Sequence, residues 1–357
     1  MPTAREEVFR KLRLRTQPFF PEIGADEKPL PPKSLAKALD PREDSRVINY
    51  YYDVYDWSAS SAVHGLTPVH GLQLFPKAAD PDRPLLVVVS GTRSSGRDSL
   101  INLILHKIGC LHDASPRVLS VSDVPRSPEL AVKHVARYFI ASWPAATQKT
   151  LGELFDFHTK EKSADTDVHY SPLFFAFRET LKGELEMPAV LSIVGTDSYD
   201  IWKSVYLSCR KLFDYIVVQT KSFRAGNTLK VSMVDTTVAH IQAQPLSAKA
   251  ALEYAKTRIA FERLGISVAN DLAPLTAQAI SLLYEPGKSA QDGYEQPKTI
   301  GWLRETLHSA MEKHVENLVK IVDDKGQAGL DALLPEHLLI SEETVWDARQ
   351  EINRGKV

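Results

Sequence analysis

The stretch from Leu85 to Leu105 constrains the fold more than any other part of the chain. Residues 85–89 are consecutive apolar residues, which predicts a strand buried on both faces. A turn rich in glycine and serine follows, and the leucines and isoleucines between 100 and 105 predict a buried helix. A strand, a glycine-containing loop and a helix in this order are typical of a phosphate site, because backbone amides and the positive end of the helix dipole point at the anion.

The loop keeps the glycine spacing of the phosphate-binding pattern G-x-x-x-x-G-K-[ST], with Gly91 and Gly96, but differs at its end. Arg97 replaces the lysine, and its guanidinium suits phosphate oxygens because it binds them in pairs and stays charged. Asp98 replaces the hydroxyl residue that holds magnesium. Asp98 either faces phosphate across a cation or stabilises the first turn of the helix with its negative charge. Ser99, one residue later than the pattern requires, is then the residue that supplies the hydroxyl. The candidate nucleotide-binding residues in the loop are Gly91, Thr92, Arg93, Ser94, Ser95, Gly96, Arg97, Asp98 and Ser99.

Strands alternate with helices in the middle of the chain, which predicts an α/β fold with a parallel sheet and helices on both faces. The further strands are expected at residues 117–124, 189–194, 215–220 and 228–235. After Ser247, a good helix cap, the pattern becomes helical and predicts an all-helical unit.

We therefore expect three regions. Residues 1–46 form an extended, loosely packed N-terminal arm, with a solvated basic helix over 4–15. Residues 47–245 form the α/β domain, and residues 246–357 form a helical, lid-like C-terminal domain.

Composition narrows the class of partner and the compartment. The 43 basic residues nearly balance the 45 acidic ones, so charge does not indicate nucleic acid. No apolar run is long enough to span a membrane, and the two cysteines, Cys110 and Cys209, are expected to be buried thiols. These features predict a cytoplasmic protein without a membrane partner. His64 and His70 have no third ligand at metal-like spacing, so no metal site is predicted.

The order of a glycine loop, parallel strands and an all-helical unit resembles the AAA+ ATPases, with the origin-recognition and signalling-NTPase branches nearest. The resemblance covers about residues 80–320 and implies a P-loop core, with ATP or GTP and magnesium as ligands. It places Asp197 where the family has a metal-and-water carboxylate, while the catalytic acid beside it is absent. It makes Gln219 or Thr220 the polar sensor.

The stretch Gly301–Leu307 is similar to the family's second sensor, G-x-x-R-x-x-L, and the resemblance has Arg304 reach back to the phosphates. Two of these roles have plain structural alternatives. Asp197 is equally suited to capping a helix after its strand, and Arg304 to a surface salt bridge.

Three functions stay open. The first is a degenerate AAA+-like protein that binds ATP or GTP weakly, or uses the site structurally, and acts as a homo- or hetero-oligomer with partner proteins. The second is an NTPase-fold scaffold that binds no nucleotide. The third is a P-loop phosphotransferase acting on a small molecule. Hydrolysis is expected to be absent or very weak, because the lysine position and the acidic motif both depart from the pattern.

Overall fold

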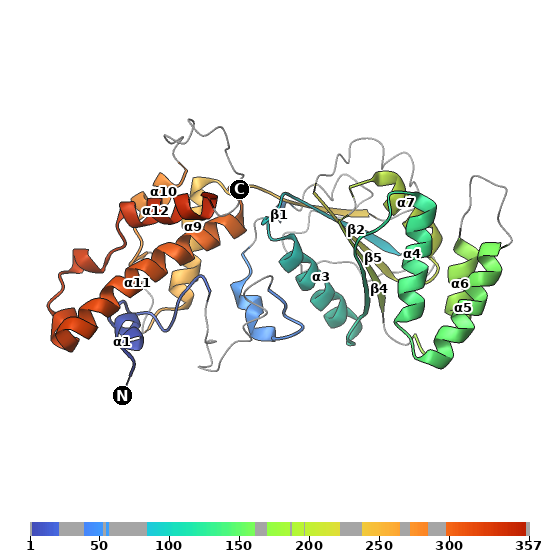
Figure 1. Ribbon diagram of the computed structural model, residues 1–357, viewed down its shortest axis with the longest axis horizontal. Helices are drawn as coiled ribbons and strands as arrows, with labels where there is room; N and C mark the ends of the chain where they lie inside the picture. Colours follow the sequence, from blue (N-terminus) through green and yellow to red (C-terminus); the bar gives the residue numbers. More distant parts are fainter. Residues whose placement is uncertain are drawn as a thin grey trace. The chain divides into compact units, whose positions relative to one another are not determined.

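The computed structural model describes residues 2–20, 39–52, 55–56, 84–160, 170–185, 188–195, 197–221, 238–264, 272–284 and 298–354. The chain divides into two compact units (Figure 1). The sheet unit comprises Tyr55–Arg93 and Leu100–Ala243. The helical unit comprises Met1–Val54, Ser94–Ser99 and Gln244–Val357. The division falls inside the predicted phosphate loop.

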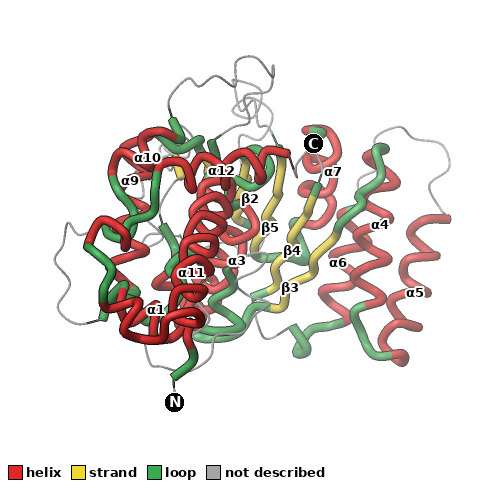
Figure 2. Tube along the Cα trace, turned by 60° about the vertical axis from the view of Figure 1, so that its left-hand side comes forward, coloured by secondary structure: helices red, strands yellow, loops and turns green. Residues whose placement is uncertain are grey.

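The sheet unit is built on a six-stranded sheet in the order β1-β6-β2-β5-β4-β3. Figure 2 shows β2, β5, β4 and β3 side by side. All neighbours pair in parallel except the short edge strand β1, which is antiparallel to β6. The strands are β1 (Tyr55–Asp56), β2 (Leu85–Ser90), β3 (Arg117–Val121), β4 (Ala189–Val194), β5 (Tyr215–Thr220) and β6 (Val238–Ala243). β2 and β5 are buried along their whole length, as their unbroken apolar runs predict.

Helices cover both faces of this sheet (Figure 1). On one face, α3 (Arg97–His112) packs its apolar residues against Leu85, Val87 and Val89 of β2. On the other face, α4 (Pro128–Ala141), α6 (Ser171–Thr180) and α7 (Tyr199–Cys209) contribute apolar residues to the core that includes Leu86 and Val88 of β2. Helix α5 (Ala145–Lys160) packs against α4 and α6. The predicted α/β class with a parallel sheet is therefore confirmed.

The helical unit has its own core, to which five helices among the described residues contribute. They are α1 (Ala4–Lys11), α9 (Ala248–Phe261), α10 (Ala277–Leu282), α11 (Ile300–Asp331) and α12 (Glu342–Arg354). As predicted, Ser247 caps α9 by accepting a hydrogen bond from the Ala250 amide. Two short 3-10 helices, Ser45–Tyr50 and Pro335–Leu338, complete the described elements.

The first residues of the chain belong to this helical core. Val8, Phe9 and Leu12 are buried, and Phe19 is buried with them. The prediction of a solvated N-terminal helix is therefore wrong, because its apolar side packs on α11 instead of facing water. Residues 21–38, most of the predicted extended segment, lie outside the described residues, as do His64 and His70.

The last predicted strand and the burial of the two cysteines differ from the expectations or lie partly outside the described residues. The predicted strand at 228–235 falls on residues that the structure does not describe. Strand β6, which pairs with β2 on the side opposite β5, was not predicted from the sequence. Cys209 is buried as expected, but Cys110 is exposed, because it lies on the side of α3 turned away from the sheet core. Burial raises the pKa of the Cys209 thiol well above its usual value.

Candidate functional site

The first part of the loop belongs to the sheet unit and starts directly after β2. The Gly91 amide donates a hydrogen bond to the Thr220 carbonyl oxygen at the end of β5, 3.3 Å away. Thr92 and Arg93 follow and are exposed. The chain thus leaves the sheet at the carboxyl ends of two neighbouring parallel strands, the edge at which ligands of open α/β sheets bind.

The second part of the loop belongs to the helical unit. Ser94 and Gly96 have positive φ angles of 61° and 86°. Glycine adopts a positive φ without steric cost, which suits it to position 96. The Ser94 carbonyl oxygen accepts a hydrogen bond of 2.9 Å from the Gly301 amide at the start of α11. Ser95 is 2% exposed, and its hydroxyl has no hydrogen-bond partner among the described residues.

The loop ends in the first turn of α3, which consists of Arg97, Asp98 and Ser99. Asp98 is exposed and lies where the helix dipole favours a negative group, whereas Arg97 is half-buried. The Ser99 hydroxyl accepts a 3.0 Å hydrogen bond from the Leu39 amide, and the Tyr51 hydroxyl lies 2.7 Å from the Ser99 carbonyl oxygen. In this conformation, protein groups already engage Ser99.

Asp197 belongs to the sheet unit, and its carboxylate holds the end of β5. Its Oδ1 accepts hydrogen bonds from the Thr220 hydroxyl at 2.8 Å and from the Lys221 amide at 2.7 Å. Ser198, rather than Asp197, is the N-cap residue of α7. Of the two polar residues predicted as a sensor, Thr220 contacts Asp197, and Gln219 is buried on the face of the sheet covered by α3.

Arg304 lies one helical turn beyond Gly301 in the helical unit. Its guanidinium stacks over the Phe20 ring, 4.4 Å from the centroid, and its Nε has no hydrogen-bond partner among the described residues. Within the part of the chain that the structure describes, Arg304 forms no salt bridge. Within the helical unit, Gly301 therefore contacts the loop residue Ser94 directly, whereas Arg304 contacts the aromatic ring of Phe20.

A second group of charges in the helical unit is structural. Glu262 is fully buried, accepts a hydrogen bond from the Tyr50 hydroxyl at 3.0 Å and lies 3.4 Å from Arg15. Burial raises the pKa values of Glu262 and Tyr50 above their usual ranges. Burial lowers the pKa of Arg258, whose guanidinium stacks over the Tyr50 ring. This cluster joins the N-terminal segment to α9.

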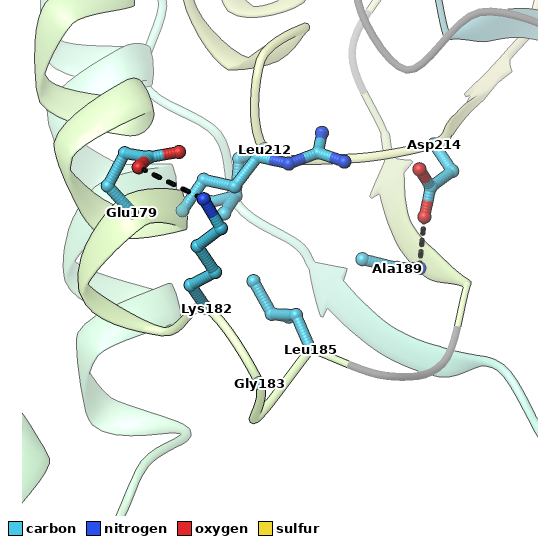
Figure 3. A pocket seen from close by; sticks show the side chains of 8 residues that line it. Glu179, Lys182, Gly183, Leu185, Ala189, Leu212 and Asp214 are labelled. Atoms are coloured by element: carbon cyan, nitrogen blue, oxygen red, sulfur yellow. Dashed lines mark hydrogen bonds and ion pairs between the residues drawn. The ribbon is translucent and has the colours of Figure 1, made fainter.

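A cavity of about 250 Å³ lies at the amino ends of β4 and β5, the edge of the sheet opposite the loop. Its walls are Arg178, Glu179, Lys182, Gly183, Leu185, Ala189, Leu212 and Asp214. In Figure 3, Lys182 points toward Glu179, and the Asp214 carboxylate accepts a hydrogen bond from the Ala189 amide. Because these charged groups bind one another or the backbone, the cavity lacks the convergent polar groups of a ligand site.

Sequence reasoning missed His240, a buried polar residue beside the start of the loop, because β6 was not predicted as a strand.

No described helix has the length and apolar character needed to cross a bilayer. Among the described residues, no three histidine, cysteine, aspartate or glutamate side chains are grouped to hold a metal ion. No protein-family model matches the chain, and no curated protein is significantly similar to it.

Proposed function

We propose that this chain is a degenerate AAA+-like P-loop protein that binds ATP or GTP weakly at Gly91–Ser99 and acts by assembling with partner proteins. The observation that carries the proposal is the course of the chain from β2 into α3. β2 lies inside the sheet between β5 and β6, and a glycine loop connects its carboxyl end to the first turn of a sixteen-residue helix. A loop in this position presents backbone amides and a helix N-terminus to an anion.

The residues of the loop are suited to a phosphate group. The positive φ angles at Ser94 and Gly96 curl the backbone, and the buried Ser95 hydroxyl is a donor without a partner among the described residues. Arg97 begins the helix and carries the positive charge that the pattern assigns to lysine. The proposed roles are therefore that the loop amides and Ser95 hold phosphate oxygens while Arg97 neutralises their charge.

The proposal covers binding and not efficient hydrolysis. Hydrolysis needs a magnesium ion between phosphate oxygens and a carboxylate that orients water. Asp98 stands where the pattern has a hydroxyl residue that contacts this ion. Asp197 Oδ1 accepts hydrogen bonds from the Thr220 hydroxyl and the Lys221 amide. These carboxylates do not make a good magnesium site beside phosphate, so no catalytic step is assigned to them.

The second candidate function is a scaffold that binds no nucleotide, and two observations favour it. The Ser94 carbonyl is bound by Gly301, and Ser99 is bound by Leu39 and Tyr51. These contacts hold the loop without a ligand. No specific observation favours the phosphotransferase alternative.

Calorimetric titration of the purified protein with ATP and with GTP, each with magnesium, tests the proposal. We expect binding in the micromolar to millimolar range and its loss in Arg97→Ala. Arg137→Ala is the matched control, because this exposed arginine lies on α4 in the sheet unit.

If the folded protein binds no nucleotide at millimolar concentration, the proposal of nucleotide binding is overturned and the scaffold function remains. Phosphate release assays give a separate test. Release should stay at background in both the wild type and Asp197→Ala, and turnover that depends on Asp197 would contradict the binding-only role.

A further inference from the structure

A buried polar pair lies at the start of the loop. The Ser90 Oγ and the His240 Nε2 are 2.8 Å apart, and the two residues are 2% and 5% exposed. Ser90 is the last residue of β2, and His240 lies in the middle of β6. The pair therefore ties two neighbouring strands together through their side chains, beside the backbone hydrogen bonds of the ladder.

The register of the sheet explains how the two side chains meet. His240 stands opposite Val88, and Ser90 stands opposite Gln242, in a parallel pairing. Alternate residues share a face, so Val88, Ser90 and His240 lie on the same face of the sheet. The imidazole reaches along the strands toward their carboxyl ends and meets the hydroxyl of Ser90.

The pair has a directional role that apolar residues lack. Burying a hydroxyl and an imidazole costs desolvation energy that an apolar pair of similar volume avoids. In return, the hydrogen bond fixes where Ser90 points and how the two strand ends align. Leu86 and Val88, earlier on the same face of β2, belong to the main apolar core, whereas Thr220 and Gln242 stand opposite Ser90 at the strand end.

The peptide that follows Ser90 is bound by β5, the neighbour of β2 on the side opposite β6. The Gly91 amide donates to the Thr220 carbonyl of β5, and the Thr220 hydroxyl donates to Asp197. The point at which the loop begins is thus fixed by β6 through a side chain and by β5 through the backbone. All of these residues lie in the sheet unit.

We propose that His240 is a positioning residue of the phosphate loop, which fixes the departure of the chain from β2 through its hydrogen bond to Ser90. This role rests on the proposed function for its ligand, a nucleoside triphosphate bound by the loop. His240 itself does not touch the ligand.

The test combines nucleotide titration with hydrogen exchange of the backbone amides of residues 88–95. His240→Leu removes the hydrogen bond at similar volume, and His240→Gln keeps an amide near the position of Nε2. Ser90→Ala removes the other partner. His112→Leu is the matched control, because it deletes an equally short hydrogen bond, between His112 Nε2 and the Tyr215 hydroxyl, at the amino end of β5. Thermal unfolding shows that each variant is folded.

We expect His240→Leu and Ser90→Ala to bind ATP about tenfold more weakly and to exchange faster at residues 88–95. His240→Gln should restore most of the affinity, and His112→Leu should match the wild type in both measurements. Unchanged affinity and exchange in a folded His240→Leu would overturn the role of His240 while leaving the proposed function intact. A wild type that binds no nucleotide overturns the proposed function instead. Hydrogen exchange then decides the role of His240 alone, supporting it if only His240→Leu and Ser90→Ala exchange faster and overturning it otherwise.

Discussion

At the residue scale, Gly301 is the position where a single methyl group has the clearest consequence. A Cβ on Gly301 would lie 2.5 Å from the Ser94 carbonyl oxygen and 2.9 Å from the Ser94 Cβ. The Gly301 amide also donates to that carbonyl, so helix α11 approaches the loop closely only because residue 301 has no side chain.

We therefore expect Gly301→Ala to destabilise the protein by about 1–3 kcal/mol, because a backbone oxygen must move to make room. Chemical denaturation measures this change. The control is Gly152→Ala on α5, where a Cβ meets nothing within 4 Å. That substitution should be neutral or stabilise by up to about 1 kcal/mol, because alanine has the higher helix propensity. Equal stability of the two variants would contradict the close approach.

We expect His314 to make the stability of the protein depend on pH. It is 8% exposed, and its Nε2 lies 3.2 Å from the Leu338 carbonyl oxygen. Burial lowers its pKa below the ordinary value of 6.5. Between the lowered pKa and 6.5, the unfolded chain binds more protons than the folded one, so stability rises with pH in that window.

We expect the melting temperature to fall as the pH drops through 6.5 toward 5, and to fall less in His314→Gln, whose side chain does not take up a proton. The measurement is thermal unfolding of both proteins across this range. His337→Gln, at an exposed histidine near the same segment, should keep the wild-type dependence. A wild-type slope in His314→Gln would show that other groups control the effect.

At the scale of elements, helix α1 is part of the helical core and not an appendage. Thr3 and Glu6 form a capping box at its start, and Val8 and Phe9 are buried on its inner side. The ion pair between Arg5 and Glu312, at 2.8 Å, joins α1 to α11 at the surface. The pair is bidentate and only partly exposed, so it adds to the apolar contacts that Val8 and Phe9 make on the inner side of the helix.

Phe9→Ala should cost about 3 kcal/mol in the free energy of unfolding, because it leaves a cavity in the helical core. Arg10→Ala is the control, since Arg10 is exposed on the same helix and should change stability by less than about 0.5 kcal/mol. Denaturant titration separates the two. A neutral Phe9→Ala would instead support a solvated arm.

At the scale of the whole molecule, neither unit is a continuous piece of sequence. The helical unit takes its residues from the N-terminal and C-terminal parts of the chain and from Ser94–Ser99 of the proposed phosphate loop. Its core includes Phe9, Leu14 and Phe19 together with residues of α9 and α11. A fragment that begins after β6 therefore lacks part of its own core.

We expect residues 246–357, expressed alone, to unfold without a cooperative transition, and a peptide of residues 1–20 to restore one in trans. Circular dichroism during heating measures both, and a peptide with Phe9→Ala and Phe19→Ala is the control. A cooperative transition of the fragment by itself would show that these residues form an independent domain.

Strands and helices with strong local patterns were predictable from the sequence. The strands at 189–194 and 215–220 occur where their apolar runs indicate them, and Ser247 caps its helix. The glycine loop leads from the first buried strand into a helix, as its residues predict. These features depend on neighbouring residues, which is why local reasoning found them.

The remaining features depend on residues far apart in the chain. β6 carries His240 and Gln242 among its apolar residues, so its sequence lacks a buried-strand pattern, and only pairing with β2 identifies it. Likewise, no local pattern shows that Asp197 bonds the end of β5 instead of capping the helix that follows it. Both assignments require the register of the sheet.

The sequence by itself determined the α/β class, the run of strand, glycine loop and helix, and the helical character of the C-terminal part. Hydrophobic periodicity and glycine spacing act over a few residues, so they suffice for this. Only the tertiary structure decided that the first twenty residues join the C-terminal core, that Gly301 contacts Ser94, and that His240 binds Ser90. Those outcomes depend on which apolar faces and polar groups meet across long separations, which no local pattern contains.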